Sequence, residues 1–160
     1  MTDQRKPRTK AGGWAKPRDL PVGETGRPLC RWCQKEIPAR RRTFCSDACV
    51  HDWRLRTDPG YLREQVLQRD RGICANCGAD TLALRRDMRR FDFAARRKFL
   101  KDWGLTERSR KSLWDADHML PVAEGGGQCD LANMRTLCLK CHREATAELR
   151  ARLKQASTIS

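Results

Sequence analysis

Apolar side chains recur along this chain at helical spacing over long stretches and at strand spacing only briefly. The longest helical pattern covers residues 84–103, where successive apolar residues are three or four positions apart. Its apolar members are Leu84, Met88, Phe91, Ala95, Phe99 and Trp103. Gly104 is suited to end this run, and Asp92 could cap a second helix inside it. The pattern therefore predicts either one helix or two in this stretch.

The segments on either side predict a small α+β domain. Asp58-Pro59 is a typical helix start, with a capping residue followed by proline in the first turn, and Gly72 is suited to end that helix. Residues 113–121 and 133–138 have the short patterns of two strands, separated by a loop that contains three consecutive glycines. Helix-forming residues follow from position 142 onward. The order strand, loop, strand, helix predicts a ββα unit with added helices before it.

Composition adds a strong positive charge and a shortage of core-forming side chains. Hydrophobic residues make up 39% of the 160 residues, and Lys plus Arg exceed Asp plus Glu by 34 to 20, which gives a net charge of +14. A chain so poor in apolar residues usually needs metal or disulfide staples. The charge favours polyanions, chiefly nucleic acid, as partners. Because the chain lacks both a run long enough to span a membrane and an apolar signal region, we expect an intracellular protein, cytoplasmic, nucleoid-associated or nuclear.

Eight of the nine cysteines fall into two groups of four, and three of their pairs have the C-x-x-C spacing. Two intervening residues let both sulfurs of a pair face one metal, and four sulfurs complete a tetrahedron around zinc. The first group is Cys30, Cys33, Cys45 and Cys49, and the second is Cys74, Cys77, Cys138 and Cys141. We predict two structural zinc ions. His51 is an alternative to Cys49 as a ligand, although we favour an ordinary surface histidine, and Cys129 is expected to be a small buried or half-buried residue.

The chain divides into three parts on these patterns. Residues 1–28 are rich in proline, glycine and basic residues, and they predict a disordered basic arm. This arm either adds phosphate contacts or is only a solvated tail. Residues 29–57 contain the first cysteine group, and Ser46 is suited to cap a short helix there. Residues 58–160 form the remaining domain, with a helical insertion at about 82–112.

The helical insertion concentrates the positive charge. Residues 83–112 contain eleven Lys and Arg residues and four acidic residues. We favour a surface that contacts phosphates over an ordinary solvated face. The candidate DNA-binding residues are Arg85, Arg86, Arg89, Arg90, Arg96 and Arg97.

The second half of the chain resembles a known family. Asp117-His118, Asn133 and Cys138-x-x-Cys141-His142 resemble the motif of HNH nucleases, which have the ββα-metal fold, and the match covers roughly residues 58–155. The stretch GGGQCDLANMRTLCLKCH is similar to the HNH domain fused to eukaryotic SNF2-type annealing helicases. The segment CRWC…FCSDAC is similar to small FCS-type zinc modules. The helical insertion departs from minimal HNH units and would suit a duplex backbone or a branched junction.

The resemblance implies a catalytic site. It makes His118 the general base that activates water, and Asp117 and His142 the protein ligands of a catalytic divalent ion. Asn133 either binds that ion through its amide oxygen or orients the His118 ring. Oxygen and nitrogen ligands suit Mg²⁺ or Mn²⁺, and Ni²⁺, Co²⁺ or Zn²⁺ could also bind.

The expected function is therefore metal-dependent DNA cleavage, as nicking or double-strand cutting. The expected partner is DNA, duplex or branched, with RNA less favoured, no membrane, and a helicase or other protein partner left unidentified. The alternative is a non-catalytic zinc module that docks on DNA and recruits another protein.

Overall fold

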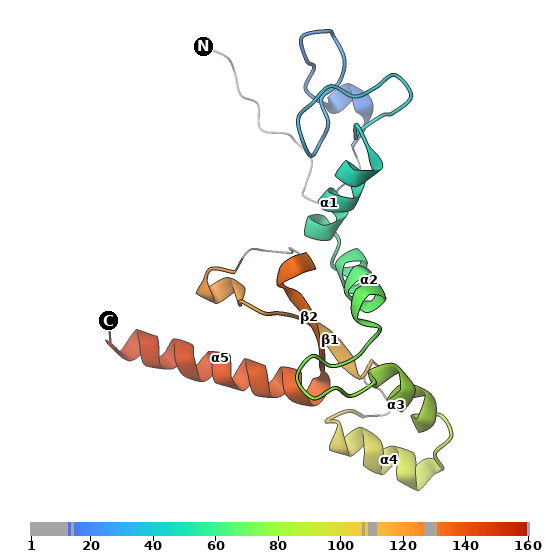
Figure 1. Cartoon of the computed structure of the whole chain (residues 1–160), viewed down its shortest axis with the longest axis vertical. Helices are drawn as coiled ribbons and strands as arrows, with labels where there is room; N and C mark the ends of the chain where they lie inside the picture. Colours follow the sequence, from blue (N-terminus) through green and yellow to red (C-terminus); the bar gives the residue numbers. More distant parts are fainter. Residues whose placement is uncertain (1–12, 14, 107, 109–111, 127–130, 160) are drawn as a thin grey trace. The chain divides into compact units, whose positions relative to one another are not determined.

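The structure, a computed structural model, describes residues 13, 15–106, 108, 112–126 and 131–159. The chain forms two compact units, residues 1–62 and 63–160 (Figure 1). Each unit contains one of the cysteine groups. Cys129 and most of the predicted arm lie outside the described residues. Within the described part, no helix is both long and apolar enough to cross a membrane.

The first unit is built from short elements around its cysteines. A 3-10 helix, η1 (Pro17–Asp19), leads to two isolated β-bridges, and the helix α1 (Asp47–Thr57) follows. Ser46 caps α1 as predicted, because its hydroxyl accepts the Cys49 amide at 3.1 Å. A small core contains the buried Cys30, Ile37 and Cys49, against which Leu20, Trp32 and Phe44 pack.

The prediction of a disordered arm is wrong for its last part, residues 15–28. Ala15 is buried, and Val22 forms an antiparallel bridge with Pro28. The Arg31 guanidinium donates to the carbonyl of Gly13 at 2.8 Å. The physical reason is that this segment packs against the cysteine core, as Leu20 does. Such contacts join residues far apart in the sequence, so the weak apolar periodicity of the segment does not predict them.

The helices that follow α1 have ends that the sequence marks, and the first of them, α2, contains the boundary between the two units. Helix α2 (Pro59–Asp70) starts after Asp58, whose carboxylate accepts the amide of Tyr61 at 3.0 Å. The long apolar run then folds as two helices, α3 (Thr81–Met88) and α4 (Phe93–Asp102). They are separate because Asp92 caps α4 and accepts the Ala95 amide at 2.8 Å. Gly104 follows α4 with a φ of 64°, a conformation that glycine adopts without strain.

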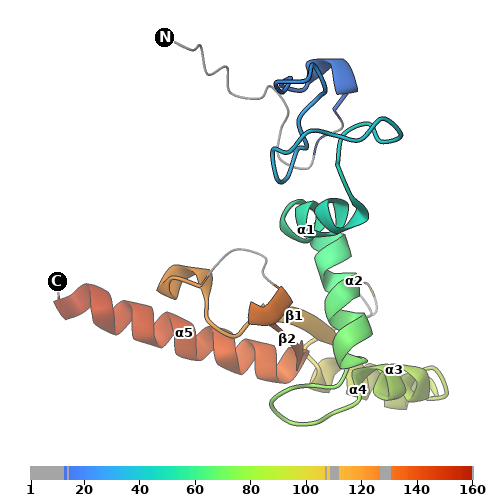
Figure 2. The ribbon, with the colours of Figure 1, turned by 45° about the horizontal axis from the view of Figure 1, so that its top comes forward.

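The predicted ββα unit is present. Strands β1 (Trp114–His118) and β2 (Met134–Cys138) pair antiparallel, and helix α5 (Leu139–Ile159) follows β2 directly. Helix α5 contacts both strands and runs beside them (Figure 2). The strand register places Asp117 opposite Arg135 and His118 opposite Met134. Strand β1 ends three residues before the predicted end, and α5 begins three residues earlier than predicted.

The core of the second unit surrounds its cysteines. The buried Trp103, Leu113, Leu137 and Leu139 pack with Cys74, Cys138 and Cys141, and Leu84 and Phe99 pack against them from the insertion. The α4 helix therefore contributes its apolar stripe to the same core as the ββα unit. This arrangement confirms a small α+β fold with cysteine clusters suited to zinc.

Candidate functional site

Both cysteine groups have the geometry of a zinc site. In each group the four sulfur atoms lie within 4.8 Å of one another. The Sγ atoms of Cys77 and Cys138 are 3.8 Å apart. Sulfurs at about 2.3 Å from a tetrahedral zinc are separated by about 3.8 Å, so the donors fit that ion. Each of the eight described cysteines is a free thiol, which leaves every sulfur of both groups available to a metal.

The first group uses Cys49, while the nearby histidine has another partner. The Sγ of Cys49 is 3.4 Å from that of Cys45, inside the four-sulfur cluster. The Nδ1 atom of His51 is instead 2.8 Å from the Tyr61 hydroxyl. Cys49 is therefore the fourth residue of the cluster that could hold a metal ion, and His51 is outside that cluster.

The thiols of the second group compete for ionisation. Burial raises the pKa of Cys74, but backbone amides of Cys138, Cys77 and Asn76 outweigh it and bring that pKa down to about 6. Burial and the neighbouring thiols raise the pKa of Cys141. One thiolate therefore forms easily and makes the next one costly, because like charges at this distance repel. A divalent cation would remove that repulsion and favour all four thiolates.

Three of the four predicted catalytic residues meet at one cavity. Asp117 and His118 end β1, His142 lies in the first turn of α5, and all three line a cavity of about 280 Å³. Asp117 Oδ1 lies 3.7 Å from His142 Nε2. One divalent ion at about 2.1 Å from each atom could bind both, so the two side chains fit the metal that the sequence predicts.

His118 faces this cavity despite the alternation of the strand. Asp117 and His118 are consecutive, so a regular strand would turn them to opposite faces. His118 is the last residue of β1, and both residues line the same cavity. Its Nε2 atom is buried and has no hydrogen-bond partner among the described residues. A buried polar atom without a partner is costly, and a water or ligand in the cavity would satisfy it.

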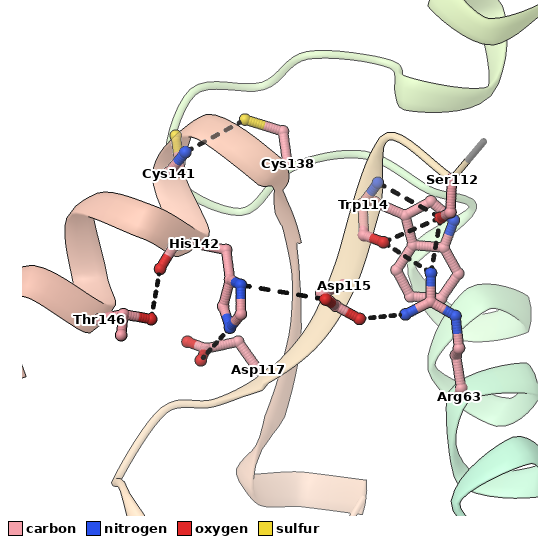
Figure 3. Close-up of polar contacts among 9 residues, drawn as sticks. All are labelled: Arg63, Ser112, Trp114, Asp115, Asp117, Cys138, Cys141, His142 and Thr146. Atoms are coloured by element: carbon pink, nitrogen blue, oxygen red, sulfur yellow. Dashed lines mark hydrogen bonds and ion pairs between the residues drawn. The ribbon is translucent and has the colours of Figure 1, made fainter. Parts of the chain in front are cut away.

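The His142 ring lies between two carboxylates of β1, Asp115 and Asp117 (Figure 3). These are two residues apart and therefore project from the same face of the strand. Asp115 Oδ2 is 4.0 Å from Nδ1 of the ring, on the edge opposite to the Asp117 contact. Sequence reasoning missed Asp115, although the spacing Asp-Ala-Asp places both carboxylates on one strand face and could have indicated it.

Arg63, from α2, holds Asp115 in place (Figure 3). Its guanidinium donates to Asp115 Oδ1 at 2.5 Å, to Ser112 Oγ at 2.7 Å and to the Trp114 carbonyl at 2.6 Å. It also lies 3.7 Å from the centre of the Trp114 ring. Arg63 precedes Asp115 by 52 residues, so no local pattern in the sequence connects them.

Arg135 adds a positive charge beside Asp117. Its Nε and Nη2 atoms both lie 3.1 Å from Asp117 Oδ2, and its side chain lines the cavity. The contact follows from the strand register, which pairs the two residues across the sheet. Sequence reasoning missed Arg135, because the pairing partner of Asp117 depends on the register of the two strands.

Asn133 makes contacts that neither sequence alternative predicted. Its Oδ1 accepts the Leu120 amide at 2.8 Å, and its Nδ2 donates to the Leu120 carbonyl at 2.9 Å. Its own carbonyl accepts the Met119 amide at 2.8 Å. Asn133 thereby fixes the turn that follows His118, and it is not among the residues that line the cavity.

The predicted DNA-binding arginines lie on the α3–α4 segment with unequal exposure. Arg86, Arg89, Arg90 and Arg97 are exposed, whereas Arg85 and Arg96 are half-buried. Phe93, at the start of α4, is also 73% exposed. The exposed surface of this segment therefore combines basic side chains with an aromatic ring.

Comparisons with known proteins identify a family and relatives of similar sequence. Residues 104–148 match the model of a family described as HNH endonuclease. The chain is 35% identical to "DNA annealing helicase and endonuclease ZRANB3" of Mus musculus, over 87% of this chain and 15% of that protein. The Homo sapiens protein of the same name is 32% identical, over 79% of this chain and 14% of the relative. The chain thus spans about 15% of the length of its relatives.

A solved structure is also similar to part of the chain. It is described as "Crystal structure of the human ZRANB3 HNH domain" and is 28% identical in sequence. The match covers 62% of this chain and 97% of that chain, with a TM-score of 0.47.

Proposed function

This chain contains a domain of the HNH endonuclease family, and from that premise we propose that it is a metal-dependent DNA endonuclease that hydrolyses phosphodiester bonds. The observation that carries the proposal is the convergence of Asp117, His118 and His142 on one cavity. The relatives of similar sequence are named as endonucleases, which supports the same class of reaction.

Each residue at the cavity has a chemical role in this proposal. His118 accepts the proton of a water molecule that attacks phosphorus, because neutral imidazole is a suitable base near neutral pH. The bond to the 3′ oxygen breaks, which leaves 5′-phosphate and 3′-hydroxyl ends. Asp117 and His142 would hold a divalent ion, Mg²⁺ or Mn²⁺, and such an ion would supply positive charge for the phosphate. Asn133 positions the turn after His118 through its two contacts with Leu120.

Arg135 supports the same site as a source of positive charge. Its guanidinium lies against Asp117 and lines the cavity in which a scissile phosphate would have to bind. Planar guanidinium groups bind phosphate oxygens through paired hydrogen bonds. Arg135 would therefore exchange its contact with Asp117 for one with the phosphate when DNA and the ion bind.

Zinc ions at both cysteine groups have a structural role in this proposal. In the second group, Cys138 ends β2 and Cys141 lies in the first turn of α5, directly before His142. A zinc ion bound there fixes the start of the helix that carries His142. The structural ion thus determines where a ligand of the catalytic ion lies.

The exposed arginines of the α3–α4 segment bind the DNA backbone in this proposal. Binding through these arginines does not depend on the base sequence, because contacts with phosphates position a protein on DNA without recognising the bases. The polymer is DNA, duplex or branched, since the relatives carry DNA in their names, and RNA is the less favoured substrate.

A plasmid nicking assay with Mg²⁺ or Mn²⁺ tests the catalytic assignment. We expect His118→Ala to lower the cleavage rate by about 10²–10⁴-fold, because that is the usual contribution of a general base. DNA affinity and zinc content should stay near those of the wild type. His51→Ala is the matched control, because His51 contacts Tyr61 outside the cavity. This variant should cleave DNA at the wild-type rate. Undiminished cleavage by the His118 variant would refute the proposed base.

The alternative function is a non-catalytic zinc module that docks on DNA and recruits a protein. The positive charge and the extra cysteine group in the first unit favour it. The same assay separates the two functions, with a reaction lacking divalent ions as the control. DNA binding without metal-dependent nicking by the wild-type protein would support the alternative.

A further inference from the structure

We propose that Arg63 and Asp115 are positioning residues, which fix the His142 ring so that its Nε2 atom faces Asp117 and the cavity. The proposal rests on the proposed function in one respect, namely that His142 is a ligand of the catalytic ion. Neither residue lines the cavity, so both act through His142.

The two edges of the His142 ring face different carboxylates. Nε2 lies 3.7 Å from Asp117 Oδ1, and Nδ1 lies 4.0 Å from Asp115 Oδ2 (Figure 3). A neutral imidazole carries one N–H group and one lone pair, on different nitrogens. Asp115 favours the proton on Nδ1, and Asp117 favours it on Nε2. A cation shared by Asp117 and Nε2 would remove the second preference, so Asp115 would then hold the proton on Nδ1 and leave the lone pair on Nε2. The lone pair then faces Asp117, which is the arrangement that a shared metal ion requires.

The separation of Asp115 and Nδ1 defines the kind of interaction. At 4.0 Å it is too long for a hydrogen bond and is an electrostatic attraction between a carboxylate and a polarised N–H group. A cation bound at Nε2 withdraws electrons from the ring and strengthens that attraction. The Asp115 contact should therefore tighten when the catalytic ion binds.

Arg63 prevents Asp115 from serving as a metal ligand itself. Asp115 Oδ1 accepts from Arg63 Nη1 at 2.5 Å, and the same guanidinium is anchored to Ser112 and to the Trp114 carbonyl. The Trp114 ring beneath it is only 5% exposed, so the platform is rigid. The arginine and aspartate side chains are 28% and 23% exposed, which weakens screening by water. This anchoring leaves Asp115 on the Nδ1 edge and leaves the ion with positions open for water and phosphate.

Nitrogen-15 NMR of the zinc-loaded protein without other divalent ions tests the proposal directly. Long-range proton–nitrogen spectra, recorded at a pH at which the ring is neutral, report which nitrogen of His142 carries the proton. We expect the share of the Nδ1–H tautomer to be lower in Asp115→Asn than in the wild type, because only Asp115 favours the proton on that nitrogen. The exposed Asp87, which lies outside the site, supplies the control Asp87→Asn, and its spectrum should match the wild type.

Titration with Mn²⁺ gives a second measurement on the same proteins. We expect Asp115→Asn to weaken Mn²⁺ binding by about 10–100-fold, which is the usual effect of losing such a supporting group. Asp115→Glu keeps the carboxylate and should retain most of the preference for the Nδ1–H tautomer. This variant replaces Asp115→Asn in the test if the asparagine variant does not fold. Arg63→Lys keeps the positive charge but loses the planar set of hydrogen-bond donors of the guanidinium. Its Mn²⁺ affinity should lie between those of the wild type and Asp115→Asn.

The outcomes separate this proposal from the proposed function. An unchanged tautomer in folded Asp115→Asn protein overturns the positioning role, whatever the protein cleaves. The other result is a tautomer share that changes in Asp115→Asn while the wild-type protein neither binds Mn²⁺ nor cleaves DNA. That result supports the positioning role and contradicts the nuclease assignment.

Discussion

Loss of the second cysteine group should unfold the second unit rather than merely weaken the enzyme. The change is Cys138→Ser, which removes one sulfur of the group Cys74, Cys77, Cys138 and Cys141. Cys138 is 2% exposed, and its Sγ also accepts the Cys141 amide at 3.5 Å. The substitution therefore removes both a metal ligand and the contact that joins β2 to α5.

The size of the effect follows from the composition of the core. Apart from cysteines, the buried core cluster contains Trp103, Leu113, Leu137 and Leu139. Burial of four such side chains contributes about 6–12 kcal/mol in total, at about 1.5–3 kcal/mol each. A structural zinc site in a small peptide contributes about 10–16 kcal/mol of apparent binding free energy. This loss is comparable to the about 5–15 kcal/mol that typically separates folded from unfolded domains, so we expect no stable fold of the second unit without the ion.

Metal analysis and circular dichroism measure this outcome. We expect Cys138→Ser to bind one zinc ion per chain instead of two and to lose the cooperative thermal transition of the second unit. Cys33→Ser is the matched control, because its sulfur belongs to the first group and its loss should leave that transition in place. A cooperative transition retained in Cys138→Ser, with a wild-type melting temperature, would mean that the apolar core suffices and that the reasoning from composition is wrong.

Two further predictions concern other parts of the second unit. The double change Arg86→Gln and Arg97→Gln should weaken binding to DNA of any sequence. The dependence of log affinity on log salt concentration should become shallower by about 1 per lost phosphate contact. Arg41→Gln is the control, because this guanidinium is bonded to Asp47 in the first unit, and equal salt dependence in wild type, control and double variant would contradict the surface assignment. Asp70→Ala should lower the unfolding free energy by about 2–4 kcal/mol, because the buried amide and hydroxyl of Thr136 lose the acceptor that each reaches at 3.0 Å. Thermal melts test this, and Asp70→Asn should recover part of the loss because its amide oxygen still accepts a hydrogen bond.

Local features were predictable wherever a short-range interaction decides them. Ser46 and Asp92 end loops and begin helices because each side chain accepts an amide three residues later. The ββα order and the apolar stripe of α4 were predictable for the same reason, since periodicity reflects which face of an element is buried. The bounds were less predictable, because the end of β1 depends on where its pairing with β2 stops.

Features of the site that depend on distant contacts were not predictable. The sequence alternatives for Asn133 were a bond to the ion or to His118, whereas its side chain contacts Leu120 on both sides of the amide. Arg135 lies beside Asp117 only because the register pairs them. These contacts depend on the folded positions of two strands and the loop between them, which no spacing along the chain fixes.

The sequence by itself determined which residues are candidates for the chemistry. These follow from the spacing within each cysteine pair, the histidines next to Asp117 and Cys141, and the charge of the insertion. Those are properties of neighbours along the chain, held by short turns. Only the tertiary structure decided that Arg63 of helix α2 reaches Asp115 of strand β1, and that Arg135 lies beside Asp117. The physical reason is that such contacts form when separate elements pack around a common core, so they depend on the whole fold.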